Sequence, residues 1–153
     1  MSYFLRVLCQ SDSRFTVRTI SDFLRDGQYF ETMPHVEAVP SQALDSQFER
    51  IDVVYDGRKR PIIITSTVGK DLTEELSELT EMARRAGISS SILQHITSTR
   101  QIVAIEVDRD HLTEEAWRFC DCLEAFIASE LKGIVFAPED GFYDKRLQLM
   151  QRV

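Results

Sequence analysis

The segment 48–68, FERIDVVYDGRKRPIIITSTV, has the clearest structural pattern in the chain. Apolar side chains occupy alternate positions in IDVVY (51–55), which is the pattern of a strand with one buried face. The dipeptide DG (56–57) is a turn signal, and the apolar run III (62–64) follows it. The segment therefore predicts a β-hairpin, and with it at least one antiparallel pair of strands.

Further strand patterns lie on both sides of this hairpin. Residues 3–9 (YFLRVLC) predict a first strand, and residues 134–137 (IVFA) predict the last one. The run 102–107 (IVAIEV) is apolar on both faces, which is typical of a central strand that is covered on both sides. The segment 28–47 contains two prolines and no sustained period, so we expect a long excursion there, with at most a short edge strand or helical turn.

Four segments have helical spacing. The first runs to Gly27, a residue that tolerates the left-handed conformation at a helix end. The second covers 70–87, where leucines and alanines line one face and Asp71 with Glu74 resembles a capping box. Residues 89–99 predict a short helix with a serine cap.

The fourth and longest helix is predicted to start at Thr113 and to be closed by Gly133. Trp117, Leu123 and Ile127 recur at helical spacing along it. We expect these three side chains to face the sheet.

The resulting order of elements begins β-α-β-β-α-β and continues with a further helix and strand. This order resembles the ferredoxin-like arrangement, a βαββαβ sandwich with a mostly antiparallel sheet and helices on one face. The resemblance implies an α+β fold, here extended by a C-terminal helix and strand. A length of 153 residues corresponds to one domain, so we expect a single domain over 1–153.

Charge and hydropathy limit the functional classes. A net charge of −7 disfavours nucleic acid and anionic membranes as partners, and the basic cluster 58–60 fits a solvated hairpin tip. The apolar runs are far shorter than the roughly 20 residues of a membrane span, and the first residues lack the layout of a signal peptide. We therefore expect a cytoplasmic protein without a membrane partner.

One acidic segment is the first candidate site. Asp108, Asp110 and His111 follow the central strand, and oxygen ligands with an imidazole could hold a divalent ion. The alternative is a polar turn in front of a Thr-capped helix, and this alternative is favoured. The other histidines and the cysteines show no spacing typical of a metal site or catalytic triad, so we expect no metal and no cofactor.

A second acidic segment follows the last predicted strand, in PEDGFYD (138–144). Its favoured interpretation is a turn whose aromatic pair covers the open end of the sheet. The alternative is that Asp140, Tyr143 and Asp144 meet the first acidic segment at one rim and form a binding site there.

The sequence contains no matched nucleophile and base and no cofactor motif, so it favours a function other than catalysis. The leading hypothesis is a non-catalytic protein-interaction or regulatory module that acts through its acidic surface and the long segment 28–47, with a protein partner or self-association. The alternatives are a small divalent-metal-dependent hydrolase, or a small-molecule sensor with its site at the rim of Asp108, His111 and Asp140.

Overall fold

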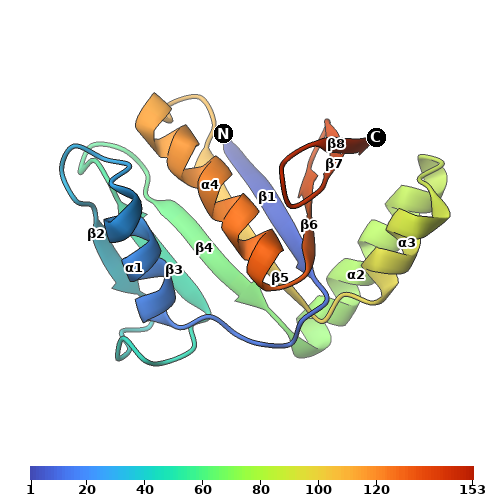
Figure 1. The fold of residues 1–153 in the computed structure, drawn as a ribbon, viewed down its shortest axis with the longest axis horizontal. Helices are drawn as coiled ribbons and strands as arrows, with labels where there is room; N and C mark the ends of the chain where they lie inside the picture. The colour runs from blue at the N-terminus through green and yellow to red at the C-terminus, as the bar shows by residue number, and fades with distance from the viewer.

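The computed structural model describes residues 1–153 as eight strands and four helices (Figure 1). The strands are β1 (Ser2–Cys9), β2 (His35–Ala38), β3 (Arg50–Val54), β4 (Ile62–Thr67), β5 (Gln101–Asp108), β6 (Gly133–Ala137), β7 (Gly141–Tyr143) and β8 (Leu149–Arg152). The helices are α1 (Val17–Gly27), α2 (Gly69–Arg85), α3 (Ser90–Thr97) and α4 (Glu114–Glu130). The predicted α+β class is confirmed.

All eight strands form one antiparallel sheet in the order β2-β3-β4-β5-β1-β6-β7-β8. The predicted hairpin is the β3–β4 pair, in which Ile51 lies opposite Ile64. The predicted central strand is β5, which pairs with both β1 and β4. The first strand of the chain therefore lies in the middle of the sheet, between β5 and β6.

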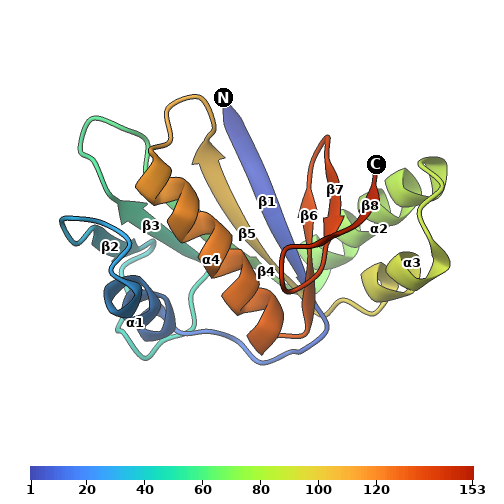
Figure 2. The ribbon, with the colours of Figure 1, turned by 45° about the horizontal axis from the view of Figure 1, so that its top comes forward.

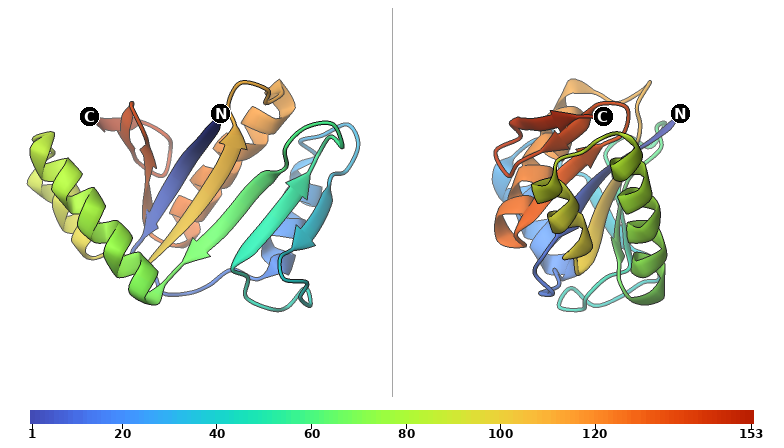
Figure 3. Two further views of the ribbon diagram at one scale, coloured as in Figure 1. Left: turned by 180° about the vertical axis from the view of Figure 1, so that it is seen from behind. Right: turned by 90° about the vertical axis from the view of Figure 1, so that its right-hand side faces the viewer.

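The helices cover both faces of this sheet (Figure 3, right). Side chains alternate along β1, so that Leu5 and Val7 pack in a large core of 23 buried residues with α1 and α4. Leu8 points the other way, into a smaller core of 11 buried residues with α2 and α3. These two clusters are called the large core and the small core below.

The predicted ferredoxin-like arrangement, with helices on one face, is not confirmed. Its order of elements is present in part, but α1 and α4 lie on one face whereas α2 and α3 lie on the other. The physical reason is that apolar side chains occupy both faces of β1, β5 and β6, so each face needs its own cover. The small core covers only part of its face, and strands β3 and β4 are open on that side (Figure 3, left).

The helix ends agree with the sequence in some places and not in others. Ser89 and Thr113 cap α3 and α4, with their side chains accepting from the amides of Ile92 and Ala116. The predicted capping box of α2 is wrong, because the residue before this helix is Val68, which makes no side-chain cap. Gly133 does not close α4: Lys132 takes the left-handed conformation, with φ 54°.

The excursion at 28–47 packs on its own molecule. Its residues 35–38 form the edge strand β2, which pairs with β3. Tyr29 and Phe30 pack against the large core, and Phe30 lies 5.8 Å from Phe119 between ring centroids. Of the two alternatives given for this segment, an edge strand or a helical turn, the edge strand is present. None of the four helices has the length and apolar character needed to cross a membrane.

The C-terminal segment adds two strands that the sequence did not predict. Residues 141–143 form β7 and residues 149–152 form β8, so the sheet continues beyond the predicted last strand. Phe142 is fully buried in the small core and stacks on Phe136 at 4.9 Å, while Tyr143 faces the opposite side of the sheet. The turn 138–140 thus connects the paired strands β6 and β7. Strands β7 and β8 and the loop between them are called the C-terminal hairpin below, and this hairpin forms one wall of the site described next.

Candidate functional site

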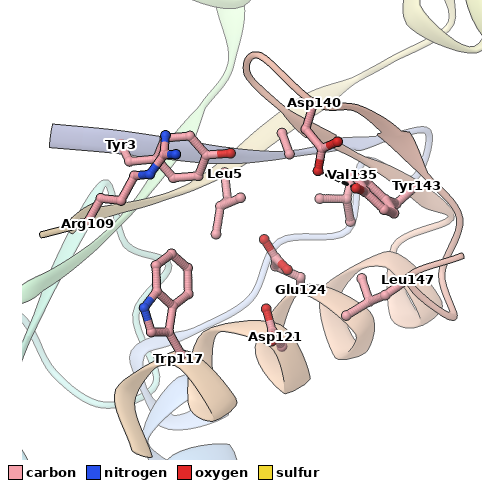
Figure 4. Close-up of a pocket in the computed structure, with 11 residues that line it drawn as sticks. Tyr3, Leu5, Arg109, Trp117, Asp121, Glu124, Val135, Asp140, Tyr143 and Leu147 are labelled. Carbon is pink, nitrogen blue, oxygen red and sulfur yellow. Dashed lines mark hydrogen bonds between the residues drawn. The ribbon is translucent and has the colours of Figure 1, made fainter. Parts of the chain in front are cut away.

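A cleft of about 440 Å³ lies on the face that α4 covers, between this helix and strands β1, β6 and β7 (Figure 4). Helix α4 supplies one wall, β1 and β6 the floor, and the C-terminal hairpin with its loop the opposite wall. Its lining residues are Tyr3, Leu5, Arg109, Trp117, Asp121, Glu124, Val135, Ala137, Asp140, Tyr143 and Leu147.

Three side chains of α4 face this cleft because of their spacing. Trp117, Asp121 and Glu124 stand four and three residues apart, which places them on one side of a helix. Figure 4 shows both carboxyl groups pointing into the cleft, with the Trp117 ring beside them and its nitrogen turned away from Glu124. This stripe lies next to the apolar stripe that contains Leu123 and Ile127, both fully buried in the large core.

Glu124 is the most unusual residue of the cleft. Its side chain is only 4% exposed, yet its Oε1 atom has no hydrogen-bond partner. Burial raises the pKa of Glu124 to about 8, and the negative charge of Asp121 adds to this. The carboxyl group is therefore mostly protonated at neutral pH, and a buried oxygen without a partner costs free energy that a bound hydrogen-bond donor would recover.

The wall on the β1 side is formed by Tyr3 and Arg109. The Tyr3 hydroxyl donates to the carbonyl oxygen of Pro138 at 3.2 Å, and partial burial raises the pKa of this tyrosine. The Arg109 guanidinium lies over the Tyr3 ring at 4.9 Å, and its Nη1 atom lies 3.6 Å from the Glu139 carboxylate. Stacking and ion pairing thus hold both side chains at the mouth of the cleft.

Asp140 holds together the wall that the C-terminal hairpin forms. Its carboxylate accepts a hydrogen bond from the Tyr143 hydroxyl and another from Arg152 Nη1 at 3.0 Å. The hydrogen bond to Asp140 raises the pKa of Tyr143, and burial adds to this effect. Asp140 thereby links β7 to β8 on this side of the cleft.

The polar groups that the cleft offers to a ligand are mainly acceptors. Both tyrosine hydroxyls already donate their protons, to Pro138 and to Asp140, which leaves the lone pairs of the phenol oxygens. Asp121, Glu124 and Asp140 contribute carboxyl oxygens. A molecule with hydrogen-bond donors at one end and an apolar remainder is therefore complementary to this cleft.

The structure divides the predicted site residues between two places. Asp140 and Tyr143 line the cleft. Asp108 accepts from the N-terminal ammonium and pairs with His111, both at 2.9 Å, which lowers the Asp108 pKa to about 2, with the ammonium the larger cause. Asp110 also accepts from this ammonium, at 3.3 Å. Asp108, Asp110 and His111 do not line the cleft, although Arg109, the residue between Asp108 and Asp110, does.

Asp144, the last predicted site residue, shapes a turn. Its Oδ1 atom accepts from the backbone amides of Arg146 and Gln148 at 2.8 and 3.0 Å. This turn brings Leu147 to the cleft, so Asp144 acts on the site through the backbone. No three His, Cys, Asp or Glu side chains converge in a way that could hold a metal ion.

Sequence reasoning missed Glu124, Asp121, Tyr3 and Arg109. The spacing of Trp117, Asp121 and Glu124 was available in the sequence, but acidic residues beside an apolar stripe usually mark a solvated helix flank. Glu124 lies in the cleft between α4 and the C-terminal hairpin, whose loop runs beside this helix (Figure 2), and that hairpin was not predicted. Recognising these residues as part of a site therefore required knowledge of a contact between α4 and a segment distant in the sequence.

Comparisons with known proteins identify no relative. No protein-family model matches the chain, and no curated protein or solved structure is significantly similar to it.

Proposed function

We propose that the protein is a non-catalytic regulatory module that binds a small molecule in the cleft around Glu124. The observation that supports this most is the Glu124 carboxyl group, which is buried, without a partner at Oε1, and directed into the cleft. A folded protein keeps such a group at a cost in stability, and polar groups of this kind are concentrated at binding sites. The aromatic and aliphatic walls of the cleft suit the remainder of a ligand.

A compound screen with Trp117 as the reporter tests this proposal. Trp117 is the single tryptophan of the chain and lines the cleft, so a ligand there should change its fluorescence and raise the melting temperature. Glu124→Gln should weaken the hits, while Glu130→Gln, at an exposed position on the same helix, should not. Hits that bind both variants equally, or a diverse library that yields none, would contradict the proposal.

Acid–base catalysis is a second candidate function. It is favoured by one observation, the pKa of about 8 that burial gives Glu124, since a carboxylic acid that keeps its proton at neutral pH can act as a general acid. Hydrolysis of chromogenic esters and glycosides tests it. The activity should fall as pH rises through about 8 and should be absent in Glu124→Gln; no turnover by the wild type would leave binding alone.

The interaction with a protein partner or a second copy remains a prediction. A basic protein partner is supported by the net charge of −7, and a second copy is supported by strand β2, whose outer edge is unpaired at the end of the sheet. Light scattering over a range of concentrations tests self-association. A monomer at every concentration would leave only a different protein as the partner.

A further inference from the structure

We propose that the cleft binds a small ammonium compound with an apolar body, its nitrogen beside Glu124 and Asp121 and its body against Trp117 and Leu147. This inference rests on the proposed function above and names the class of ligand. Its basis is that the cleft contains hydrogen-bond acceptors and negative charge for which the protein supplies no partner.

The first argument is the charge of the cleft. Three acidic side chains line it, whereas Arg109 is the single basic one, and the Arg109 guanidinium already stacks on Tyr3 and pairs with Glu139. Arg152 neutralises part of Asp140 from outside the cleft. The charge that remains unbalanced lies on the α4 wall, at Asp121 and, when it ionises, at Glu124.

The second argument is the direction of the hydrogen bonds. Oε1 of Glu124 is buried without a partner, and the hydroxyl protons of Tyr3 and Tyr143 are already used. An ammonium group has three donors and no acceptor, so it matches a site that offers acceptors. The Trp117 ring lies beside these oxygens and supplies apolar surface next to the place of the ammonium group.

The third argument is the shape of the site. The floor is apolar, formed by Leu5, Val135 and Ala137, and Leu147 closes one side. A volume of about 440 Å³ accommodates a ring or short aliphatic chain together with the ammonium group. A free inorganic cation would leave this apolar part empty.

Binding of an ammonium compound should be coupled to loss of the Glu124 proton. Because burial raises the pKa of Glu124 to about 8, the ionised fraction of this carboxyl group grows as pH rises from 7 to 8.5. The ammonium binds the ionised form more tightly, so its affinity should rise severalfold over this interval. The other groups that surround Glu124 are Tyr3, Arg109, Cys120, Asp121, Asp140 and Tyr143.

Three compounds of matched shape test the inference: cyclohexylmethylamine, cyclohexylmethanol and cyclohexanecarboxylate. We expect the amine to bind at least tenfold more tightly than the alcohol by calorimetry, and the carboxylate to bind most weakly. The amine should release close to one proton at pH 7, measured in two buffers of different ionisation enthalpy. Trp117 fluorescence, which these compounds do not obscure, confirms that binding occurs in the cleft.

The variants separate the role of Glu124 from general surface charge. In Glu124→Gln the preference for the amine and the pH dependence should both be lost, whereas Glu130→Gln should match the wild type. Equal or tighter binding of the alcohol or carboxylate, or an amine affinity that is flat between pH 7 and 8.5, would overturn the ammonium inference and leave a ligand cleft. If none of the three binds, this inference also fails, and the compound screen decides the proposed function separately.

Discussion

Asp121 and Glu124 lie one helical turn apart on α4 and line the same cleft, but Asp121 is exposed whereas Glu124 is 4% exposed. Burial raises the pKa of both carboxyl groups, and the effect is larger for Glu124. Burial holds the Glu124 pKa at about 8, above its ordinary value of 4.5. In the unfolded chain this proton is lost near the ordinary value, so between the two values the folded state binds more protons than the unfolded state.

The first prediction follows from this difference in bound protons. The free energy of unfolding should fall as pH rises from 4.5 towards 8, because Glu124 ionises in the unfolded chain but keeps its proton in the folded protein. Above 8 the carboxyl group ionises in both states, so the free energy should level off. Glu124→Gln removes this dependence and should exceed the wild type in stability by about 3 kcal/mol at pH 7. Urea unfolding at several pH values measures the difference, and a constant gap across this range would contradict the raised pKa.

The second prediction concerns Trp117, which only partly faces the sheet. Its side chain is half-buried and lines the cleft, so Trp117→Ala should cost about 1 to 2 kcal/mol, less than a core aromatic. Phe119 on the same helix is fully buried in the large core, and Phe119→Ala should cost about 3 to 5 kcal/mol. Thermal unfolding of both variants is the measurement; a larger loss for Trp117 than for Phe119 would contradict this assignment.

The third prediction concerns the turn at 108–111. Asp108 is engaged by the N-terminal ammonium and His111, and no group of ligands suited to a metal is present. Addition of Mg²⁺, Mn²⁺ or Zn²⁺ should therefore leave the melting temperature unchanged. A saturable rise that disappears in Asp110→Asn would reveal a metal site and support the hydrolase hypothesis.

The fourth prediction tests how the C-terminal hairpin is held. Gly141 pairs with Arg152, and a Cβ atom at Gly141 would lie 2.3 Å from the carbonyl oxygen of Gln151. Gly141→Ala should therefore push β8 away from β7, destabilise the protein by about 1 to 3 kcal/mol, and weaken any ligand of the cleft. Gly57→Ala is the control, since nothing lies within 4 Å of a Cβ atom there. Equal melting temperatures for the two variants would contradict the close approach.

The sequence predicted those parts of the fold that depend on local patterns. The hairpin 50–67, the central strand β5 and the Thr113 cap all follow from alternation, apolar runs or a single side chain next to a helix. The placement of α2 and α3 on the second face could not be predicted, because both faces of β1 contain apolar residues and either could receive a helix. Spacing alone does not distinguish these alternatives.

Prediction of the candidate site depended even more on contacts between residues that are distant in the sequence. The favoured interpretation of segment 138–144 was a structural turn, and only the alternative placed Asp140 and Tyr143 at a binding rim. Both residues line the cleft, together with Glu124 and without Asp108 or His111. Strands of three and four residues such as β7 and β8 are too short to be recognised from alternation. Without them Glu124 would belong to a solvated helix flank, so the residue that defines the site was not predicted.

The unequal size of the two cores has a consequence for local unfolding. The small core joins α2 and α3 to one end of the sheet through 11 buried residues, and Phe142 belongs to it. A unit held by fewer apolar contacts opens at lower free energy, so amide hydrogens in α2 and α3 should exchange with solvent sooner than those in α4. Because Phe142 precedes Tyr143 on the same short strand, each opening of the helical pair would also loosen one wall of the cleft, and occupancy of the cleft should slow exchange on the far side of the sheet.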